Sequence, residues 1–224
     1  MKKLLITIDG PAGAGKTTVS RALADRLGYR YIDTGALYRG VALAAKTQGI
    51  DPLIDADLKQ LCEGLELAFV VADDGLRLIS DGQDITTRIR TPEITMLASA
   101  VSARPVVRDY LLDLQKDMGS EKAAVFEGRD MGTVVFPTAD VKFFLDASAR
   151  KRAERRFDEF NSDISQTLDE VQRDIQQRDQ NDSTREVAPL KPAPDAIIID
   201  STELTVAQVV DLMVSHITEK AINK

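Results

Sequence analysis

The stretch Gly10–Thr17 places the strongest constraint on what this chain can fold into. It reads Gly-Pro-Ala-Gly-Ala-Gly-Lys-Thr, matches Gly-x4-Gly-Lys-Ser/Thr at every fixed position and follows the apolar run Leu4–Ile8. This context predicts a strand, a glycine-rich loop and a helix over Lys16–Leu27, whose backbone N–H groups form an anion site. We expect Lys16 to reach the β- and γ-phosphates of a nucleotide, and the Thr17 hydroxyl to hold Mg²⁺.

The order of the remaining predicted elements indicates an α/β fold. Further strands are expected at Tyr29–Asp33, Ala123–Phe126, Val141–Leu145 and Ile197–Asp200. Helices are expected over Ala36–Thr47, Ala56–Gly64, Pro105–Met118 and Val206–Lys220, and from Pro92 onward. This alternation predicts a three-layer P-loop fold with a parallel five-stranded sheet and right-handed crossovers. Ligands of such sheets bind at the carboxyl ends of the strands, so polar residues that follow a strand are candidates for the site.

One segment interrupts the parallel pattern with short strands. Apolar pieces at Leu65–Ala72, Gly75–Ser80 and Gln83–Ile85 are separated by aspartate and glycine residues typical of hairpin turns. The segment therefore predicts a small antiparallel β insert at about residues 65–90, which we interpret as a decoration of the substrate side.

A second segment, Ala149–Ala193, is rich in charged residues and glutamine. Its spacing predicts two mostly polar helices with a break at Asn161–Ser165. Such helices make a poor core but a good cover, because a lid must open into water at modest cost. We therefore expect a helical lid over residues 150–190.

Composition excludes several classes of protein. A formal net charge of −7 argues against a nucleic-acid scaffold, which needs a broad basic face. The first apolar segment is too short for a signal peptide or a membrane span. The single thiol, Cys62, forms no intrachain disulfide and is typical of the reducing cytosol. We expect a cytoplasmic monomer with no nucleic-acid or membrane partner.

Arginines supply the charge that phosphoryl transfer requires, because this chemistry depends on positioning and neutralisation more than on bond-making side chains. Arg129 follows a predicted strand and is flanked by glycine and aspartate. Arg178, Asp182 and Arg185 are spaced to share one face of a helix. Either they form an intrahelical salt bridge, or the two guanidinium groups close onto the transferring phosphoryl group while Asp182 is available to a sugar hydroxyl.

Four blocks of the chain resemble the bacterial cytidylate kinases. They are Gly10–Thr17, the Asp-Thr-Gly-Ala-Leu-Tyr-Arg of Asp33–Arg39, the Glu-Gly-Arg-Asp-Met-Gly-Thr-Val-Val-Phe of Glu127–Phe136, and the Arg-Glu-Val-Ala-Pro-Leu of Arg185–Leu190. The resemblance covers nearly the whole chain, and the third block is far more specific than the P-loop. It implies a nucleoside monophosphate kinase that uses ATP to phosphorylate CMP and dCMP.

The resemblance also implies a layout and a set of roles. The chain would be one kinase domain, 1–224, with a nucleoside-monophosphate-binding region at 34–110 that includes the β insert. The implied ATP-binding residues are Gly10, Pro11, Ala12, Gly13, Ala14, Gly15, Lys16, Thr17 and Thr18. The implied substrate residues are Thr34, Arg39 and Arg129 for the phosphate, Ser99, Arg108 and Asp130 for cytosine, and Arg178 and Asp182 for the sugar. Lys16, Arg129, Arg178 and Arg185 would act in catalysis, and Asp33 is a second candidate ligand for Mg²⁺ beside Thr17.

One departure and two alternatives stay open at this level. The family often has serine where this chain has Thr34, so the hydroxyl is kept while a methyl group is added beside the sugar. A kinase for another nucleoside monophosphate is the nearest alternative, and Asp130 with Arg108 argues for cytosine. A nucleotide-dependent switch is the other, but the guanine-reading Asn-Lys-x-Asp pattern is absent from the sequence.

Overall fold

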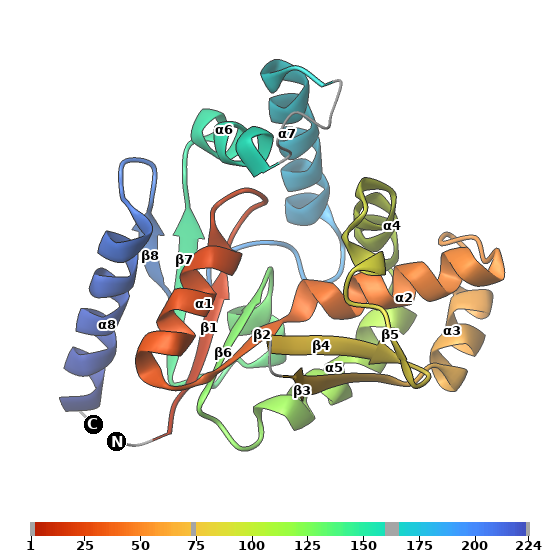
Figure 1. The fold of residues 1–224 in the computed structure, drawn as a ribbon, viewed down its shortest axis with the longest axis horizontal. Coiled ribbons are helices and arrows are strands. Elements are labelled where there is room, and N and C mark those ends of the chain that lie inside the picture. The colour runs from red at the N-terminus through yellow and green to blue at the C-terminus, as the bar shows by residue number, and fades with distance from the viewer. Residues whose placement is uncertain (1–2, 73–74, 160–165, 223–224) are drawn as a thin grey trace. The chain divides into compact units, whose positions relative to one another are not determined.

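The computed structural model describes residues 3–72, 75–159 and 166–222, and Figure 1 shows their helices and strands. The chain divides into two compact units. The first unit comprises Met1–Tyr31 and Glu121–Lys224, and the second comprises Ile32–Ser120. Each unit has a hydrophobic core of its own.

A five-stranded sheet organises the first unit. Its strands are β1 (Leu5–Asp9), β2 (Arg30–Asp33), β6 (Ala124–Gly128), β7 (Val141–Asp146) and β8 (Ile197–Asp200), in the order β2-β6-β1-β7-β8. β1 pairs in parallel with both β6 and β7, and β7 pairs in parallel with β8. The predicted parallel sheet is confirmed. The last two residues of β2 belong by contact to the second unit.

Helices α1 (Lys16–Leu27) and α8 (Val206–Ile222) cover one face of this sheet (Figure 1). Alternate strand residues point to that face, because side chains in a strand repeat every second residue. Ile6, Ile8 and Phe143 are almost fully buried there, with Leu23 of α1 and Met213 of α8. Both helices begin at the residues expected from their apolar spacing.

A short π-helical turn, η2 (Met131–Val135), lies against the other face and was not predicted. A methyl group on Gly132 would lie 3.1 Å from Thr7 Oγ1 and 3.2 Å from Lys142 Cδ, so this turn packs directly on β1 and β7. The run Met-Gly-Thr-Val-Val has β-branched residues that favour a strand by local preference. Contacts with distant residues determine its conformation instead.

Helices α6 (Ala149–Glu159) and α7 (Leu168–Thr184) belong to the predicted lid segment. They pack through a small apolar cluster in which Ala153, Val171 and Ile175 are buried. Thr167 and Glu170 form a reciprocal capping box that fixes the start of α7. The predicted break at Asn161–Ser165 lies outside the described residues.

The second unit is mainly helical. It contains α2 (Thr34–Gln48), α3 (Asp55–Gly64), a short 3₁₀ turn η1 (Arg88–Arg90), α4 (Pro92–Ser102) and α5 (Pro105–Gly119). Their facing sides bury Leu37, Val41, Leu58, Val101 and Leu111. Proline at the first position of α4 and of α5 is suited to a helix start, because the N–H that it lacks has no partner within the helix.

The predicted β insert is confirmed as a three-stranded antiparallel sheet in the second unit. Its strands are β3 (Leu67–Ala72), β4 (Gly75–Ser80) and β5 (Gln83–Asp84), in that order. Leu67 and Leu78 join the helical core of this unit. They lie 3.1–3.3 Å from the position that a methyl group on Gly40 would take, so α2 and the insert pack closely at this glycine.

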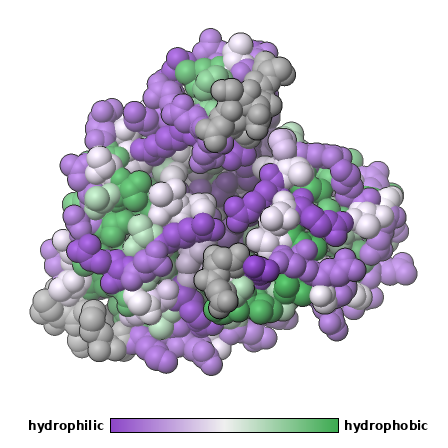
Figure 2. Space-filling model, in the orientation of Figure 1, coloured by the Kyte–Doolittle hydropathy of each residue, from purple (hydrophilic) through white to green (hydrophobic). Residues whose placement is uncertain are grey.

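Exposed apolar side chains occur on several separate elements. Among those in helices and strands, the most exposed are Val71 of β3, Met96 of α4 and Ile198 of β8. Leu53, in a loop, is similarly exposed. On the face drawn in Figure 2, hydrophilic side chains dominate and the apolar areas are separate patches. Within the described residues, the helices are all too short or too polar to cross a bilayer.

Candidate active site

The P-loop follows β1 and has a backbone that glycine alone can adopt at its key points. Gly10 has φ 151°, and a methyl group there would lie 2.0 Å from the carbonyl oxygen of Leu145. Gly13 and Gly15 have φ values of 74° and 85°, which disfavour any other residue. Gly15 is the N-cap of α1 and offers no side chain to the helix N–H groups. The loop is therefore shaped for an anion at the helix N-terminus.

Lys16 and Thr17 start α1 from this loop. The Lys16 ammonium donates a hydrogen bond to the carbonyl oxygen of Pro11 at 2.6 Å, and the residue is buried. Burial, with the nearby charge of Arg129, lowers the pKa of Lys16 well below its ordinary value. The Thr17 hydroxyl donates to Glu127 Oε1 at 2.9 Å, so a carboxylate from the end of β6 meets the P-loop hydroxyl.

A cluster of arginines and carboxylates forms around Asp182 of α7. Arg129 Nε donates to Asp182 Oδ2 at 2.9 Å, and Arg185 lies 3.9 Å from Asp182 Oδ1 and 3.5 Å from Asp130 Oδ1. Burial alone would raise the pKa of Asp182, but the charges of Arg129, Arg178 and Arg185 lower it below its ordinary value. Three cations thus converge on one buried carboxylate, a pattern that suits a phosphate or another anion.

Four of the predicted substrate residues lie in the second unit. The Asp33 carboxylate caps α2 by accepting from the Ala36 N–H, and it also accepts from Arg39 at 2.6 Å. Thr34 is buried directly after this cap. The cap and the ion pair together fix the first turn of α2, which carries both Thr34 and Arg39.

Arg108 connects the ends of two helices in the same unit. It is buried on α5, and its Nη1 donates to the carbonyl oxygen of Ser102 at 3.1 Å. Its guanidinium carbon lies 5.6 Å from the centre of the Tyr38 ring, within the range of a cation–π contact. Ser99, half-buried on α4, accepts a hydrogen bond from the Ser102 hydroxyl through its carbonyl oxygen.

A cavity of about 410 Å³ in the first unit opens beside the P-loop. Its lining includes Gly13 to Gly15, Thr18, Arg155, Ser201 and Thr205. Arg155 donates to the carbonyl oxygen of Ala14 at 3.2 Å and to that of Ser201 at 2.7 Å. Arg155 therefore links the phosphate loop to the β8–α8 connection, and both segments line the cavity.

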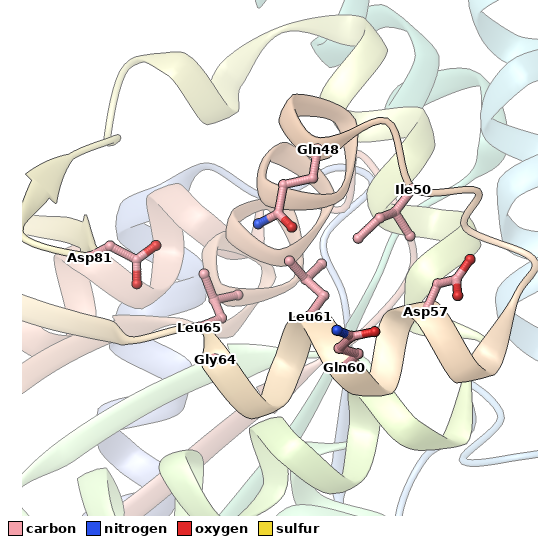
Figure 3. Close-up of a pocket in the computed structure, with 8 residues that line it drawn as sticks. All are labelled: Gln48, Ile50, Asp57, Gln60, Leu61, Gly64, Leu65 and Asp81. Carbon is pink, nitrogen blue, oxygen red and sulfur yellow. The ribbon is translucent and has the colours of Figure 1, made fainter.

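A second cavity, of about 320 Å³, lies in the second unit, and Figure 3 shows its lining. Gln48 of α2 points toward Leu61 and Leu65, while Asp57 and Asp81 stand at opposite sides. Its lining contains two carboxylates and no lysine or arginine, so this cavity does not suit a phosphate.

Comparison with known proteins identifies the family. The family model described as cytidylate kinase matches residues 6–219. The chain belongs to the cytidylate kinase family. It is 52% identical over 218 residues to the cytidylate kinase of Geobacter sulfurreducens, covering 97% of this chain and 94% of that protein. It is 46% identical over 220 residues to the cytidylate kinase of Mannheimia succiniciproducens, covering 98% of both chains. The predicted family and enzyme class are confirmed.

Solved structures support the fold of this cytidylate kinase family member. A shikimate kinase from Bacteroides thetaiotaomicron aligns with a TM-score of 0.51 at 14% identity, over 97% of this chain and 99% of that chain. At such low identity the likeness concerns the fold alone, and it agrees with the predicted P-loop α/β class.

Sequence reasoning missed three residues that contact the predicted site. Glu127 is the carboxylate that meets Thr17, whereas Asp33 is engaged as a helix cap and by Arg39. Arg152 of α6 donates to the carbonyl oxygen of Ala12 at 2.9 Å and pairs with Asp179 of α7. Asp179 in turn accepts from the Ala12 N–H at 3.2 Å. No local sequence pattern indicates these three contacts. The capping role of Asp33 does have a local signal, since aspartate is a favoured N-cap residue.

Asp9, at the end of β1, is a further buried carboxylate that was not predicted. Both of its oxygens accept backbone hydrogen bonds, from Met131 N at 2.8 Å and Gly132 N at 2.7 Å. Burial is the largest cause that raises the pKa of Asp9 to about 6, with a smaller contribution from the charge of Asp130; the two backbone bonds and the charge of Lys16 act in the opposite direction. Ionised Asp9 at neutral pH is therefore costly to the fold.

This cost predicts a pH-dependent difference in stability between the wild type and Asp9→Asn. A carboxyl with pKa 3.8 unfolded and about 6 folded keeps its proton longer in the folded state, so its contribution to stability falls as pH rises from 4 to 7. Between pH 4 and pH 7 the fall should be about 2.4 kcal/mol. Urea unfolding of both proteins at pH 4, 5, 6 and 7 measures it, and a difference that stays constant across this range would contradict the prediction.

Proposed function

We propose that this chain transfers the γ-phosphoryl group of ATP to CMP or dCMP, giving ADP and CDP or dCDP. The observation that carries the proposal is the convergence of Arg129, Arg178 and Arg185 on one buried anion position, beside a P-loop lysine, in a member of the cytidylate kinase family. Phosphoryl transfer needs cations at the oxygens where charge develops, and needs little other chemistry from the protein.

ATP would bind through the P-loop residues from Gly10 to Thr18. Backbone N–H groups of the loop and of the first turn of α1 would hold the phosphates. The Lys16 ammonium would contact the β- and γ-phosphates and neutralise part of their charge. The cavity lined by Thr18, Arg155 and Thr205 adjoins the loop, and we assign the nucleoside part of ATP to it.

Thr17 and Glu127 are the residues that fit Mg²⁺. A hydroxyl and a carboxylate oxygen already in contact at 2.9 Å are hard ligands of the kind this ion prefers. Mg²⁺ would neutralise charge on the β- and γ-phosphates. Asp33 fits less well, because its oxygens are engaged by the Ala36 N–H and by Arg39.

Three groups of residues would hold the phosphate, the sugar and the base of the nucleoside monophosphate. Thr34, Arg39 and Arg129 would contact its phosphate, Arg178 and Asp182 its sugar, and Ser99, Arg108 and Asp130 its base. Asp182 pairs with Arg129 and Arg185, so an incoming phosphate would compete with this carboxylate for the charge of the two arginines.

A turnover assay with ATP and each of CMP, dCMP, UMP, AMP and GMP tests the proposal. We expect diphosphate product with CMP and dCMP and much slower turnover with the other three. Preference for another nucleoside monophosphate would assign the enzyme to a different substrate, and nucleotide binding without any diphosphate product would favour a switch.

The lid arginines give a separate prediction. Replacing Arg178 or Arg185 with alanine should lower kcat by more than tenfold and change the Kd for ATP much less, because these contacts strengthen only as charge develops in the transfer. Arg150→Ala is the matched control, since Arg150 on α6 forms exposed ion pairs with Glu154 and Asp169. Steady-state kinetics with an ATP titration by calorimetry separates the two effects. Equal losses in kcat and in ATP binding would contradict a role in the transfer step.

A further inference from the structure

Asp9 holds the backbone directly after Asp130. It is 3% exposed at the carboxyl end of β1, and its two oxygens accept from the N–H groups of Met131 and Gly132, the first two residues of η2. These are N–H groups that a helical turn leaves without a partner in its own backbone. A carboxylate from a distant strand therefore caps this turn.

Asp130 occupies the position from which a side chain would ordinarily provide that cap. Aspartate is among the residues most favoured there. Yet Asp130 makes no capping hydrogen bond from its side chain, and its backbone has φ −144° and ψ 21°, outside the extended region usual for a cap. Its Oδ1 instead lies 3.5 Å from Arg185 Nη2.

We propose that Asp9 is a positioning residue that caps the η2 turn in place of Asp130, and so keeps the Asp130 carboxylate directed toward Arg185 and the substrate base. Asp130 is the N-cap residue of η2, so without Asp9 its own carboxylate is the one that the N-cap position offers to these N–H groups. Asp130 would then turn toward its own backbone and lose its orientation for recognition.

The inference rests on the proposed function, in which Asp130 reads cytosine. It goes beyond the proposed function, because Asp9 has no nucleotide-binding role there and acts on Asp130 through the η2 turn. It also explains why an ionised carboxylate is retained in a buried site where burial disfavours its charge.

Asp9→Asn tests the proposal, because the amide keeps one acceptor oxygen and turns an NH₂ group toward the other N–H. We expect kcat/KM for CMP to fall by roughly tenfold to a hundredfold and the CMP-to-UMP ratio of kcat/KM to fall by at least about tenfold. The Kd for ATP alone should stay within about twofold, since the two bonds that this change alters go to Met131 and Gly132 of η2 and not to the P-loop.

Asp140→Asn is the matched control. Asp140 is also buried, and its Oδ2 accepts from the N–H of Leu5 at the other end of β1. The control should lose stability while its CMP-to-UMP ratio stays that of the wild type. A double variant, Asp9→Asn with Asp130→Asn, should have the same CMP-to-UMP ratio as Asp130→Asn alone. Both changes act on the same interaction, that of the Asp130 carboxylate with the base.

An unchanged ratio in Asp9→Asn, a parallel loss of ATP binding, or additive effects in the double variant would overturn the proposal. If Asp9→Asn does not fold, Gly132→Ala disturbs the same turn from the other side. Its methyl group would lie 3.3 Å from Asp9 Oδ2, and the ratio must fall in this variant as well. Wild-type protein that does not phosphorylate CMP would refute the proposed function instead, so the two failures are distinguishable.

Discussion

Lys16→Ala is expected to lower kcat by roughly a thousandfold, equivalent to about 4 kcal/mol of transition-state stabilisation. The lysine is 7% exposed and held against the P-loop by its bond to Pro11, so its charge is already oriented and partly removed from water. A fixed charge in such a position acts on the transferring oxygens without reorganisation during the reaction. Steady-state turnover with saturating ATP and CMP measures the effect.

Two comparisons make the Lys16 experiment specific. Lys16→Arg should not restore the rate, because the guanidinium fork does not replace a compact ammonium at this site. Lys59→Ala removes an exposed lysine of α3 that lies 4.0 Å from Glu63, and it should leave kcat unchanged. Turnover of Lys16→Ala within tenfold of the wild type would contradict the role assigned to this lysine.

The parts of the fold that depend on local signals could be predicted from the sequence. Helix α1 has the predicted bounds, Lys16–Leu27, because glycines fix the loop before it and Gly28 supplies the left-handed residue that ends it. The β insert could be predicted for the same kind of reason, since strand period and turn residues are both local. The second turn of that insert has Asp81 and Gly82, both with positive φ, as hairpin chemistry requires.

The parts that depend on distant contacts could not be predicted. The hydrogen bonds that Asp9 accepts from Met131 and Gly132 join residues more than a hundred positions apart. They override the strand preference of Val134 and Val135 in η2. The contact of Arg152 with Ala12 is equally remote in sequence. Spacing placed Arg178, Asp182 and Arg185 on one helix face but left two interpretations. In the structure α7 ends at Thr184, and Arg185 follows it with an extended backbone, so the three residues do not share one helix face. Asp182 pairs with Arg185 and with Arg129, and the catalytic role stays a prediction.

Asp130→Asn is expected to narrow the preference for CMP over UMP by about a hundredfold, mainly through lost activity with CMP. Cytosine presents an N4 amino donor, which a carboxylate accepts, whereas uracil presents an O4 acceptor, which a carboxylate repels. Asp130 is 2% exposed, so little water can reach the site to reduce the repulsion between its carboxylate and the O4 of uracil. An asparagine can present either its oxygen or its NH₂ group, and the discrimination by charge is lost. The ratio of kcat/KM for CMP and UMP in both proteins measures the change.

Asp182→Asn is the matched control for this prediction, because Asp130 and Asp182 are both buried carboxylates beside Arg185. Loss of either one changes the charge around that arginine, and turnover should fall in both variants. CMP and UMP share the same ribose, so a residue that addresses the sugar should leave their ratio unchanged and alter the ratio of CMP to dCMP. If Asp130→Asn lowers turnover with CMP and UMP alike, Asp130 serves only to orient Arg185, and the recognition of cytosine must then come from Ser99 and Arg108.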